Sequence, residues 1–187
     1  YVALDGDNEN DGLTAENPLQ NIQYAMSIII PSSIERRTIY VADGLYGLST
    51  NGESFPLNLI SNVTISGNSQ EGVILDANSS GILINMKKIN DMTLSNVTLT
   101  GGMDMGGIWS VGAGCVNVHQ SQQIVLENVT VTNTHSGTPV KIGSSDAMLK
   151  RVNITKNHLL SGGTSAIVLS GGGAFVQCVN TLISDNQ

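Results

Sequence analysis

Asn62-Val-Thr-Ile-Ser-Gly67 returns along the chain as Asn96-Val-Thr-Leu-Thr-Gly101 and as Asn128-Val-Thr-Val-Thr-Asn133, and a weaker copy is Arg151-Val-Asn-Ile-Thr-Lys156. In each copy apolar residues alternate with small polar ones, which is the pattern of a β-strand. The valines in second position are separated by steps of 34, 32 and 23 residues. Steps of this size are typical of the coils of a solenoid and are too long for hairpins.

The alternation changes phase inside the repeat. Leu94 is out of phase with Val97 and Leu99, and the change falls at Asn96. Asparagine tolerates a left-handed backbone, so the first residue of each copy is predicted to turn a corner between two sheets. The residues predicted to fill the interior are Val97, Leu99, Val129, Val131, Val152 and Ile154.

Two further features follow from this assignment. The corner residues are expected to stack as a ladder of Asn62, Asn96 and Asn128, with Arg151 and Cys178 replacing asparagine in later coils. The small polar residues are expected to face outward as two columns, made by Thr64 and Ser66, Thr98 and Thr100, Thr130 and Thr132, and Asn153 and Thr155. Flat threonine columns can order water in ice-binding proteins, but threonine is also simply a good outward-facing strand residue.

A helix is predicted only near the start of the chain. Asn17 is expected to cap it, Pro18 suits the first helical position, and an apolar stripe follows. Such a helix would cover the open end of the first coil. The fold class is therefore all-β, a parallel β-helix with an N-terminal amphipathic capping helix. We expect one domain over residues 1–187, with the cap in 1–37 and stacked coils in 38–187, as a fragment of a longer protein.

Composition excludes several partners. The chain has 21 glycines, 4% aromatic and 12% charged residues, and a formal net charge of -7. It therefore has no basic footprint for nucleic acid. No apolar run approaches the roughly 20 residues that cross a bilayer, so membrane insertion is not expected.

The cysteines and two of the histidines have predicted positions in the stack. Cys115 and Cys178 are expected to be buried free thiols about two coils apart, too distant for a disulfide. His135 and His158 lie 23 residues apart and are expected to stack on neighbouring coils, with rings about 5 Å apart. A metal would need a third ligand, and the equivalent residue one coil earlier is predicted to be Met103. A stack without metal is therefore favoured.

The N-terminal region resembles a known group of proteins. Tyr1-Val-Ala-Leu-Asp-Gly-Asp7, Asn17-Pro-Leu-Gln-Asn-Ile-Gln-Tyr-Ala25 and Thr38-Ile-Tyr-Val-Ala-Asp-Gly-Leu-Tyr46 are similar to the cap of secreted bacterial right-handed β-helix proteins of the pectin-lyase-like superfamily. The closest resemblance is to an uncharacterised branch found in large exported, often surface-attached proteins. The resemblance implies the right-handed fold and a secreted or cell-surface location in bacteria.

Catalytic members of this superfamily use clustered aspartates together with a lysine or arginine. The coils here offer Asp76, Asp91, Asp104, Asp146 and Asp185 in separate registers, without a paired motif. The cap loop instead carries Asp5, Asp7, Glu9 and Asp11, a pattern like the start of a calcium loop. Its twelfth position is Pro18, where a complete EF-hand loop has glutamate. Calcium is the one cofactor considered, and a solvated cap loop is the alternative.

The long irregular insertion from Gly101 to Ser110 contains Asp104 and Trp109, and Trp109 could stack on a sugar or pack in the core. The leading hypothesis is an extracellular, non-catalytic β-helix module for carbohydrate or cell-surface recognition or display. Its expected partners are a polysaccharide or cell-surface glycan and further coils or domains of the same polypeptide. The alternative is a polysaccharide lyase or glycoside hydrolase whose active site is unrecognised or lies beyond residue 187, and a minor alternative is ice binding.

Overall fold

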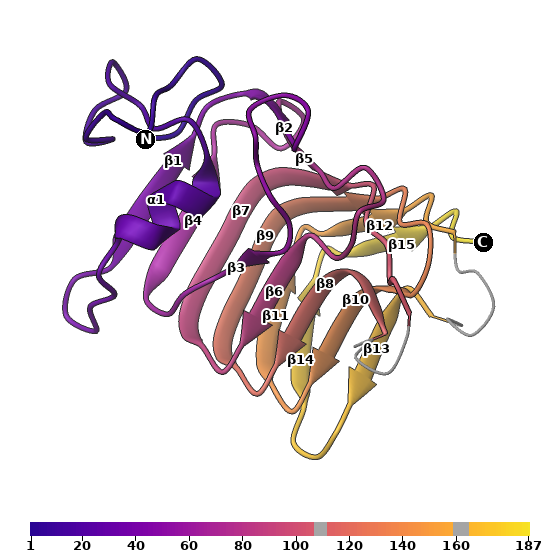
Figure 1. Cartoon of the computed structure of the whole chain (residues 1–187). Coiled ribbons are helices and arrows are strands. Elements are labelled where there is room, and N and C mark those ends of the chain that lie inside the picture. The colour runs from indigo at the N-terminus through magenta and orange to yellow at the C-terminus, as the bar shows by residue number, and fades with distance from the viewer. Residues whose placement is uncertain (107–111, 159–164) are drawn as a thin grey trace.

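The computed structural model describes residues 1–106, 112–158 and 165–187. In this part of the chain fifteen strands wind into a stack of coils, with one helix at the N-terminal end (Figure 1). Neighbouring strands of the stack pair in parallel. The predicted right-handed parallel β-helix and the all-β class are confirmed.

Each complete coil has three sides, called here face one, face two and face three. Face one contains β1 (Arg37–Val41), β4 (Val63–Gly67), the first half of β7 (Asn90–Thr100), the first half of β9 (Gln122–Thr132), β11 (Asp146–Lys150) and β14 (Phe175–Val179). Face two contains β2 (Gly44–Tyr46), β5 (Val73–Asp76), the second halves of β7 and β9, β12 (Asn153–Thr155) and β15 (Leu182–Ser184). Face three contains β3 (Leu57–Asn58), β6 (Ile84–Lys87), β8 (Ala113–His119), β10 (Thr138–Gly143) and β13 (Ile167–Ser170).

The corner between faces one and two is made by residues with positive φ. Asn96, Asn128 and Arg151 have φ of 56°, 53° and 53°. Nδ2 of Asn128 donates to Oδ1 of Asn96 (2.8 Å), and Nε of Arg151 donates to Oδ1 of Asn128 (2.6 Å). This part of the predicted ladder is confirmed. In the last coil the corner residue is Asn180, with φ of 50°, and the prediction of Cys178 there is wrong.

Asn62 belongs to a different corner, so the predicted ladder is wrong at its first member. The pairing of β4 with β7 aligns Thr64 with Thr93, 29 residues later, rather than with Thr98. Thr98 pairs instead with Ile74, 24 residues earlier. Asn62, with φ of 61°, turns the chain from face three into face one. The corner between faces one and two and the corner between faces three and one both use a residue with a left-handed backbone conformation. The same Asn-Val-Thr sequence therefore fits either corner.

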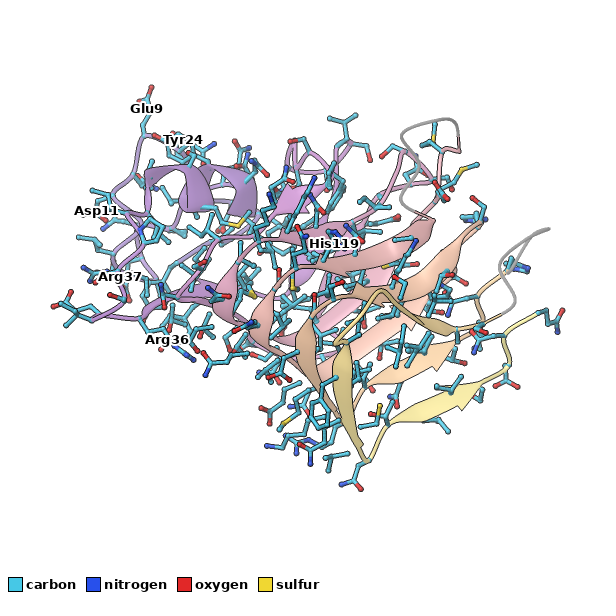
Figure 2. All side chains as sticks on the ribbon, turned by 90° about the horizontal axis from the view of Figure 1, so that it is seen from below. Glu9, Asp11, Tyr24, Arg36, Arg37 and His119 are labelled. Carbon is cyan, nitrogen blue, oxygen red and sulfur yellow. The ribbon has the colours of Figure 1, made fainter. Side chains whose placement is uncertain are left out.

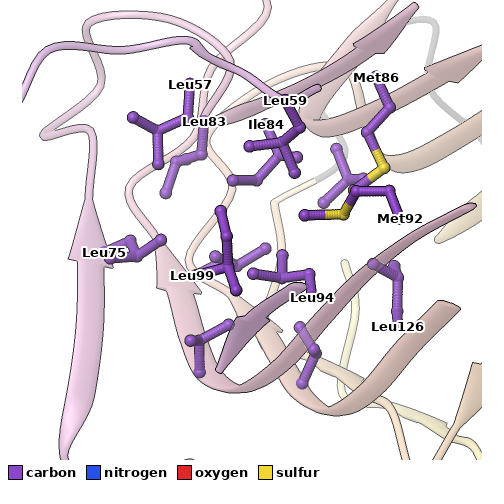
Figure 3. Close-up of a cluster of buried hydrophobic side chains, with 14 of the residues drawn as sticks. Leu57, Leu59, Leu75, Leu83, Ile84, Met86, Met92, Leu94, Leu99 and Leu126 are labelled. Carbon is purple, nitrogen blue, oxygen red and sulfur yellow. The ribbon is translucent and has the colours of Figure 1, made fainter. Parts of the chain in front are cut away.

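The core lies between the three faces and is filled by columns of aliphatic side chains (Figure 3). One column runs through Ile39, Ile65, Leu94, Leu126 and Leu149; another through Leu75, Leu99, Val131 and Ile154; a third through Ile84, Val116 and Val140. All six residues predicted for the interior are fully buried. Each large aliphatic side chain buried in this way stabilises the fold by about 1.5–3 kcal/mol.

The cap helix α1 (Ile22–Ile28) starts later than predicted. Its N-cap is Asn21, whose side chain accepts a hydrogen bond from the Tyr24 N–H (2.9 Å). Pro18 lies outside the helix, because the next residue, Leu19, forms a parallel bridge with Val2 and donates its N–H to the Tyr1 carbonyl (2.9 Å). The predicted covering role is supported, since the helix buries Ile22, Ala25 and Met26 in the core.

A buried carboxylate holds the start of α1 against the coils. Glu53 is fully buried, and its two carboxylate oxygens accept hydrogen bonds from the N–H groups of Ile22 (2.7 Å) and Gln23 (2.9 Å). These N–H groups have no partner inside a helix, so an acceptor from another segment satisfies them. Burial raises the pKa of the Glu53 carboxyl, and these hydrogen bonds oppose that rise.

The thiols differ from the prediction in one respect. Cys115 is buried in the core, as expected, whereas Cys178 is exposed. Cys178 continues a core column beyond Leu149, but no strand of the described chain covers its other side. Neither thiol forms a disulfide. Among the described residues, no helix is long and apolar enough to span a membrane.

Candidate functional site

The insertion expected to bind a ligand is only partly described. Trp109 lies in 107–111, outside the described residues. Asp104 lies on the turn between β7 and β8, where its N–H donates to the Ser136 carbonyl (3.2 Å) and its Oδ1 accepts from the Gly106 N–H (3.1 Å). These bonds order the turn, and a ligand role for Asp104 and Trp109 stays a prediction.

The cap loop does not present a preformed calcium site. Its side chains Asp5, Asp7, Glu9 and Asp11 are all exposed, and Figure 2 shows Glu9 pointing away from the coils. Oδ1 of Asp7 accepts from the Glu9 N–H, and Oδ1 of Asp11 accepts from the Leu13 N–H, both at 2.9 Å. Over the described ranges, no three His, Cys, Asp or Glu side chains form a group that could hold a metal. Calcium binding stays a prediction and would require the loop to rearrange.

Two aspartates of the coils take part in local structure. Asp91, near the start of β7, pairs with Arg36, and Oδ1 of Asp76 accepts from the Asn78 N–H (2.7 Å). These contacts account for both carboxylates without catalysis. We therefore assign neither Asp76 nor Asp91 to an acid–base pair of the enzyme alternative.

The threonine columns on face two are partly covered. The pairing of Thr98 with Thr130 is as predicted, whereas Thr64 belongs to face one. The loop between β4 and β5 crosses the columns: Gln70 Nε2 donates to Thr130 Oγ1, and Thr98 Oγ1 donates to the Gln70 carbonyl, each at 2.8 Å. A covered, hydrogen-bonded surface disfavours ice binding.

Face three has a polar outer surface. Asn85 Nδ2 donates to Asn58 Oδ1 (2.8 Å), and Asn117 Nδ2 donates to Asn85 Oδ1 (2.9 Å), which forms an amide ladder. Lys87 pairs with His119 in the next outward column, and His119 is seen on β8 in Figure 2. The five strands of this face contain no Asp or Glu, although the chain carries a net charge of -7. This surface could attract an anionic ligand.

A groove beside the cap combines aromatic and polar side chains. Tyr1 and Tyr40 stack with ring centroids 5.2 Å apart and an interplanar angle of 27°. They are 40% and 49% exposed, so part of each ring is available to a ligand. Both line a groove of about 290 Å³, together with Asp43, Ser66 and Asn68.

The backbone explains how these residues meet. The chain start runs parallel to β1, because the Val2 N–H donates to the Tyr40 carbonyl (2.8 Å) and the Val2 carbonyl accepts from the Ala42 N–H (2.9 Å). This pairing places Tyr1 beside Tyr40. In the next coil Ser66 lies beside Tyr40, since the two are partners in the pairing of β1 with β4.

The polar rim of the groove is ordered by its own hydrogen bonds. The two carboxylate oxygens of Asp43 accept from Asn68 Nδ2 (2.8 Å) and Ser69 Oγ (2.9 Å). The carboxylate retains further acceptor capacity, and Asn68 retains its amide oxygen. An aromatic platform beside planar polar groups is suited to a ligand that has apolar faces and hydroxyl edges.

The family model described as "Protein of unknown function (DUF1565)" matches residues 4–187. The chain belongs to the DUF1565 family. A search of curated proteins finds no match.

Two crystal structures of pectin methylesterase are similar to this DUF1565 chain. One is a mutant in complex with a hexasaccharide, with a TM-score of 0.47 and 12% identity over 84% of this chain and 54% of its own. The other, in complex with a different hexasaccharide, has a TM-score of 0.48 and 11% identity over 91% of this chain and 66% of its own. The chain thus spans about half to two thirds of their length, and we transfer no residue role at this level of similarity.

Sequence reasoning missed the groove of this DUF1565 protein. Tyr1, Tyr40 and Asn68 are far apart in the chain, and each of them, like Asp43, fits an ordinary strand or turn. A usable signal was present at Tyr40: a large aromatic at an outward position of β1 is unusual in a chain with 4% aromatic residues.

Proposed function

We propose that this chain is a non-catalytic carbohydrate-recognition module of a larger exported bacterial protein, located outside the cell or on its surface. The groove lined by Tyr1, Tyr40, Asp43, Ser66 and Asn68 is the proposed binding site. The observation that carries the proposal is the partly exposed tyrosine pair next to a polar rim.

The chemistry of a sugar fits the two halves of this site. The C–H faces of a pyranose ring are apolar and can lie on the exposed part of a tyrosine ring, as apolar groups do on amphipathic aromatics. The hydroxyl groups can donate to the Asp43 carboxylate or the Asn68 carbonyl. Because β1 and β4 hold both halves on a rigid stack, little conformational entropy is lost on binding.

The charge of the region favours a neutral glycan over a polyuronate. Asp43 lies on the rim itself, and the nearby cap carries Asp5, Asp7, Glu9 and Asp11. Like charges at an interface are unfavourable, and at physiological salt they act over about 8 Å. A neutral polysaccharide or cell-surface glycan avoids this repulsion.

The test is a glycan array with the whole chain, followed by calorimetric titration of the best ligand into variants. Truncation of a central aromatic contact costs about 2 kcal/mol, so Tyr40→Ala is expected to bind roughly 30-fold more weakly. Tyr24→Ala is the matched control, because Tyr24 is a similarly exposed tyrosine on α1 outside the groove. Circular dichroism confirms that both variants are folded.

Other outcomes contradict the proposal in distinct ways. Equal binding by Tyr40→Ala and wild type would remove the groove as the site. If the protein bound anionic glycans and Lys87→Ala abolished that binding, the binding site would lie on face three. Turnover of a polysaccharide would favour the enzyme alternative, and we expect none.

A further inference from the structure

His135 and His158 face one another on neighbouring coils, just beyond β9 and β12. Their rings are stacked with centroids 6.3 Å apart and an interplanar angle of 11°, which confirms the predicted stack. Both residues are exposed. In the preceding coil the His135 N–H donates to the Gly102 carbonyl (2.8 Å), which aligns Met103 with His135 as the spacing predicts, and Met103 also forms a parallel bridge with the next residue, Ser136.

The backbone beneath the two histidines is tightly held. The His158 N–H donates to the Thr134 carbonyl (2.8 Å), which places the two histidines in paired register. Asn157, beside His158, is 1% exposed, and its Oδ1 accepts from the Thr134 N–H (2.9 Å) while its Nδ2 donates to the Val131 carbonyl (3.1 Å). The two Cα positions are therefore fixed about one strand spacing apart, roughly 4.8 Å, and both side chains are exposed.

We propose that His135 and His158 form an open-sided site for a divalent transition-metal ion. A metal bound to one nitrogen of each ring at 2.0–2.1 Å in tetrahedral geometry brings the ring centroids to roughly 5 Å. Because the stacked rings are nearly parallel, their in-plane nitrogen lone pairs do not converge, so binding requires at least one ring to rotate out of the stack as the centroids close by about 1 Å from 6.3 Å.

The site offers two protein ligands, with water in the remaining positions. In the part of the chain that the structure describes, no third His, Cys, Asp or Glu side chain joins the two histidines, so the site differs from the three-ligand site considered from the sequence and relies on water to complete the coordination. Imidazole suits copper, nickel and zinc, and affinity rises from nickel to copper and falls again at zinc. Cu²⁺ is therefore expected to bind most tightly. Mg²⁺ and Ca²⁺, which prefer oxygen ligands, are expected not to compete.

The experiment is calorimetric titration of Cu²⁺, Ni²⁺ and Zn²⁺ into the whole chain carrying Cys178→Ser, since the exposed thiol would otherwise reduce or bind copper. Electron paramagnetic resonance of the copper complex reports how many nitrogens are bound. We expect one copper per chain with two imidazole nitrogens. His135→Ala and His158→Ala should each weaken binding at least about tenfold, which corresponds to 1.4 kcal/mol.

His119→Gln is the matched control, because it removes the third and last histidine of the chain from a different face. It should leave copper binding unchanged. Unchanged affinity in the His135→Ala/His158→Ala double variant, or a spectrum with a single nitrogen, would overturn the proposal. Glycan binding is measured separately through Tyr40, so this result and that of the proposed function are independent.

Discussion

The corner at Asn128 provides a stringent test of the structure. Its φ of 53° lies in the left-handed region, and its side chain links Asn96 to Arg151 by hydrogen bonds of 2.8 and 2.6 Å. Asn128→Ala places a Cβ in this backbone conformation without the local hydrogen bonding that makes asparagine tolerant, which costs about 1 kcal/mol. It also removes two hydrogen bonds, each contributing roughly 0.5–1 kcal/mol at a partly exposed site.

We therefore expect Asn128→Ala to lower the free energy of unfolding by about 2.5 kcal/mol. Asn128→Gly loses the same two hydrogen bonds and more chain entropy, about 0.5 kcal/mol, but glycine adopts positive φ without strain, so the expected loss is about 2 kcal/mol, smaller than for alanine. The diagnostic quantity is the sign of the difference between these variants. At an ordinary strand position glycine is less stable than alanine by about 0.5–1 kcal/mol, and at this corner the order is reversed.

Equilibrium unfolding in urea, followed by circular dichroism, measures these differences. Val125 is the matched control, because it lies three residues earlier in β9 and does not have positive φ. Val125→Gly should be less stable than Val125→Ala. If Asn128→Ala proved as stable as Asn128→Gly, the left-handed corner and the reasoning from it would be refuted.

Two further predictions concern Glu53 and the thiols. Because burial raises the folded-state pKa of Glu53, its favourable contribution is complete below the ordinary value of 4.5 and is lost as pH rises through the raised value. In urea titrations, the unfolding free energy of wild type relative to Glu53→Gln should therefore fall as the pH rises above the ordinary value of 4.5 and through the raised pKa, and a constant difference would contradict the buried carboxyl group. Burial raises the pKa of the Cys115 thiol, whereas Cys178 is exposed, so a thiol reagent should modify one cysteine in the native protein and the second only after unfolding. Rapid reaction of both would show that the core is open.

The fold was predictable because its repeating pattern is local. The alternation around Asn96 and Asn128 assigned the inward and outward residues correctly, since strand side chains alternate strictly. The register between neighbouring strands was harder to predict from the sequence. Asn62 precedes the same Asn-Val-Thr pattern but lies at a different corner. Both corners use a residue with a left-handed backbone, so this short sequence does not specify at which corner it lies.

Local reasoning also failed at the start of the cap helix. Pro18 suits a helix start, but the pairing of Leu19 with the start of the chain keeps this segment outside the helix. Glu53 accepts hydrogen bonds from the first N–H groups of α1, those of Ile22 and Gln23, which lie 31 and 30 residues away in the chain. No local sequence pattern predicts this contact.

The sequence by itself determined the parallel β-helix, its core residues, its corner asparagines and the stacking of His135 on His158. All of these depend on periodicity, which a linear pattern carries directly. Only the tertiary structure decided which coils stack in register, that Gln70 lies over the threonine columns, and that Tyr1 and Tyr40 meet beside Asp43. Those arrangements depend on loop paths and on pairing between distant segments, where the free energy of packing, rather than any local preference, selects the partner.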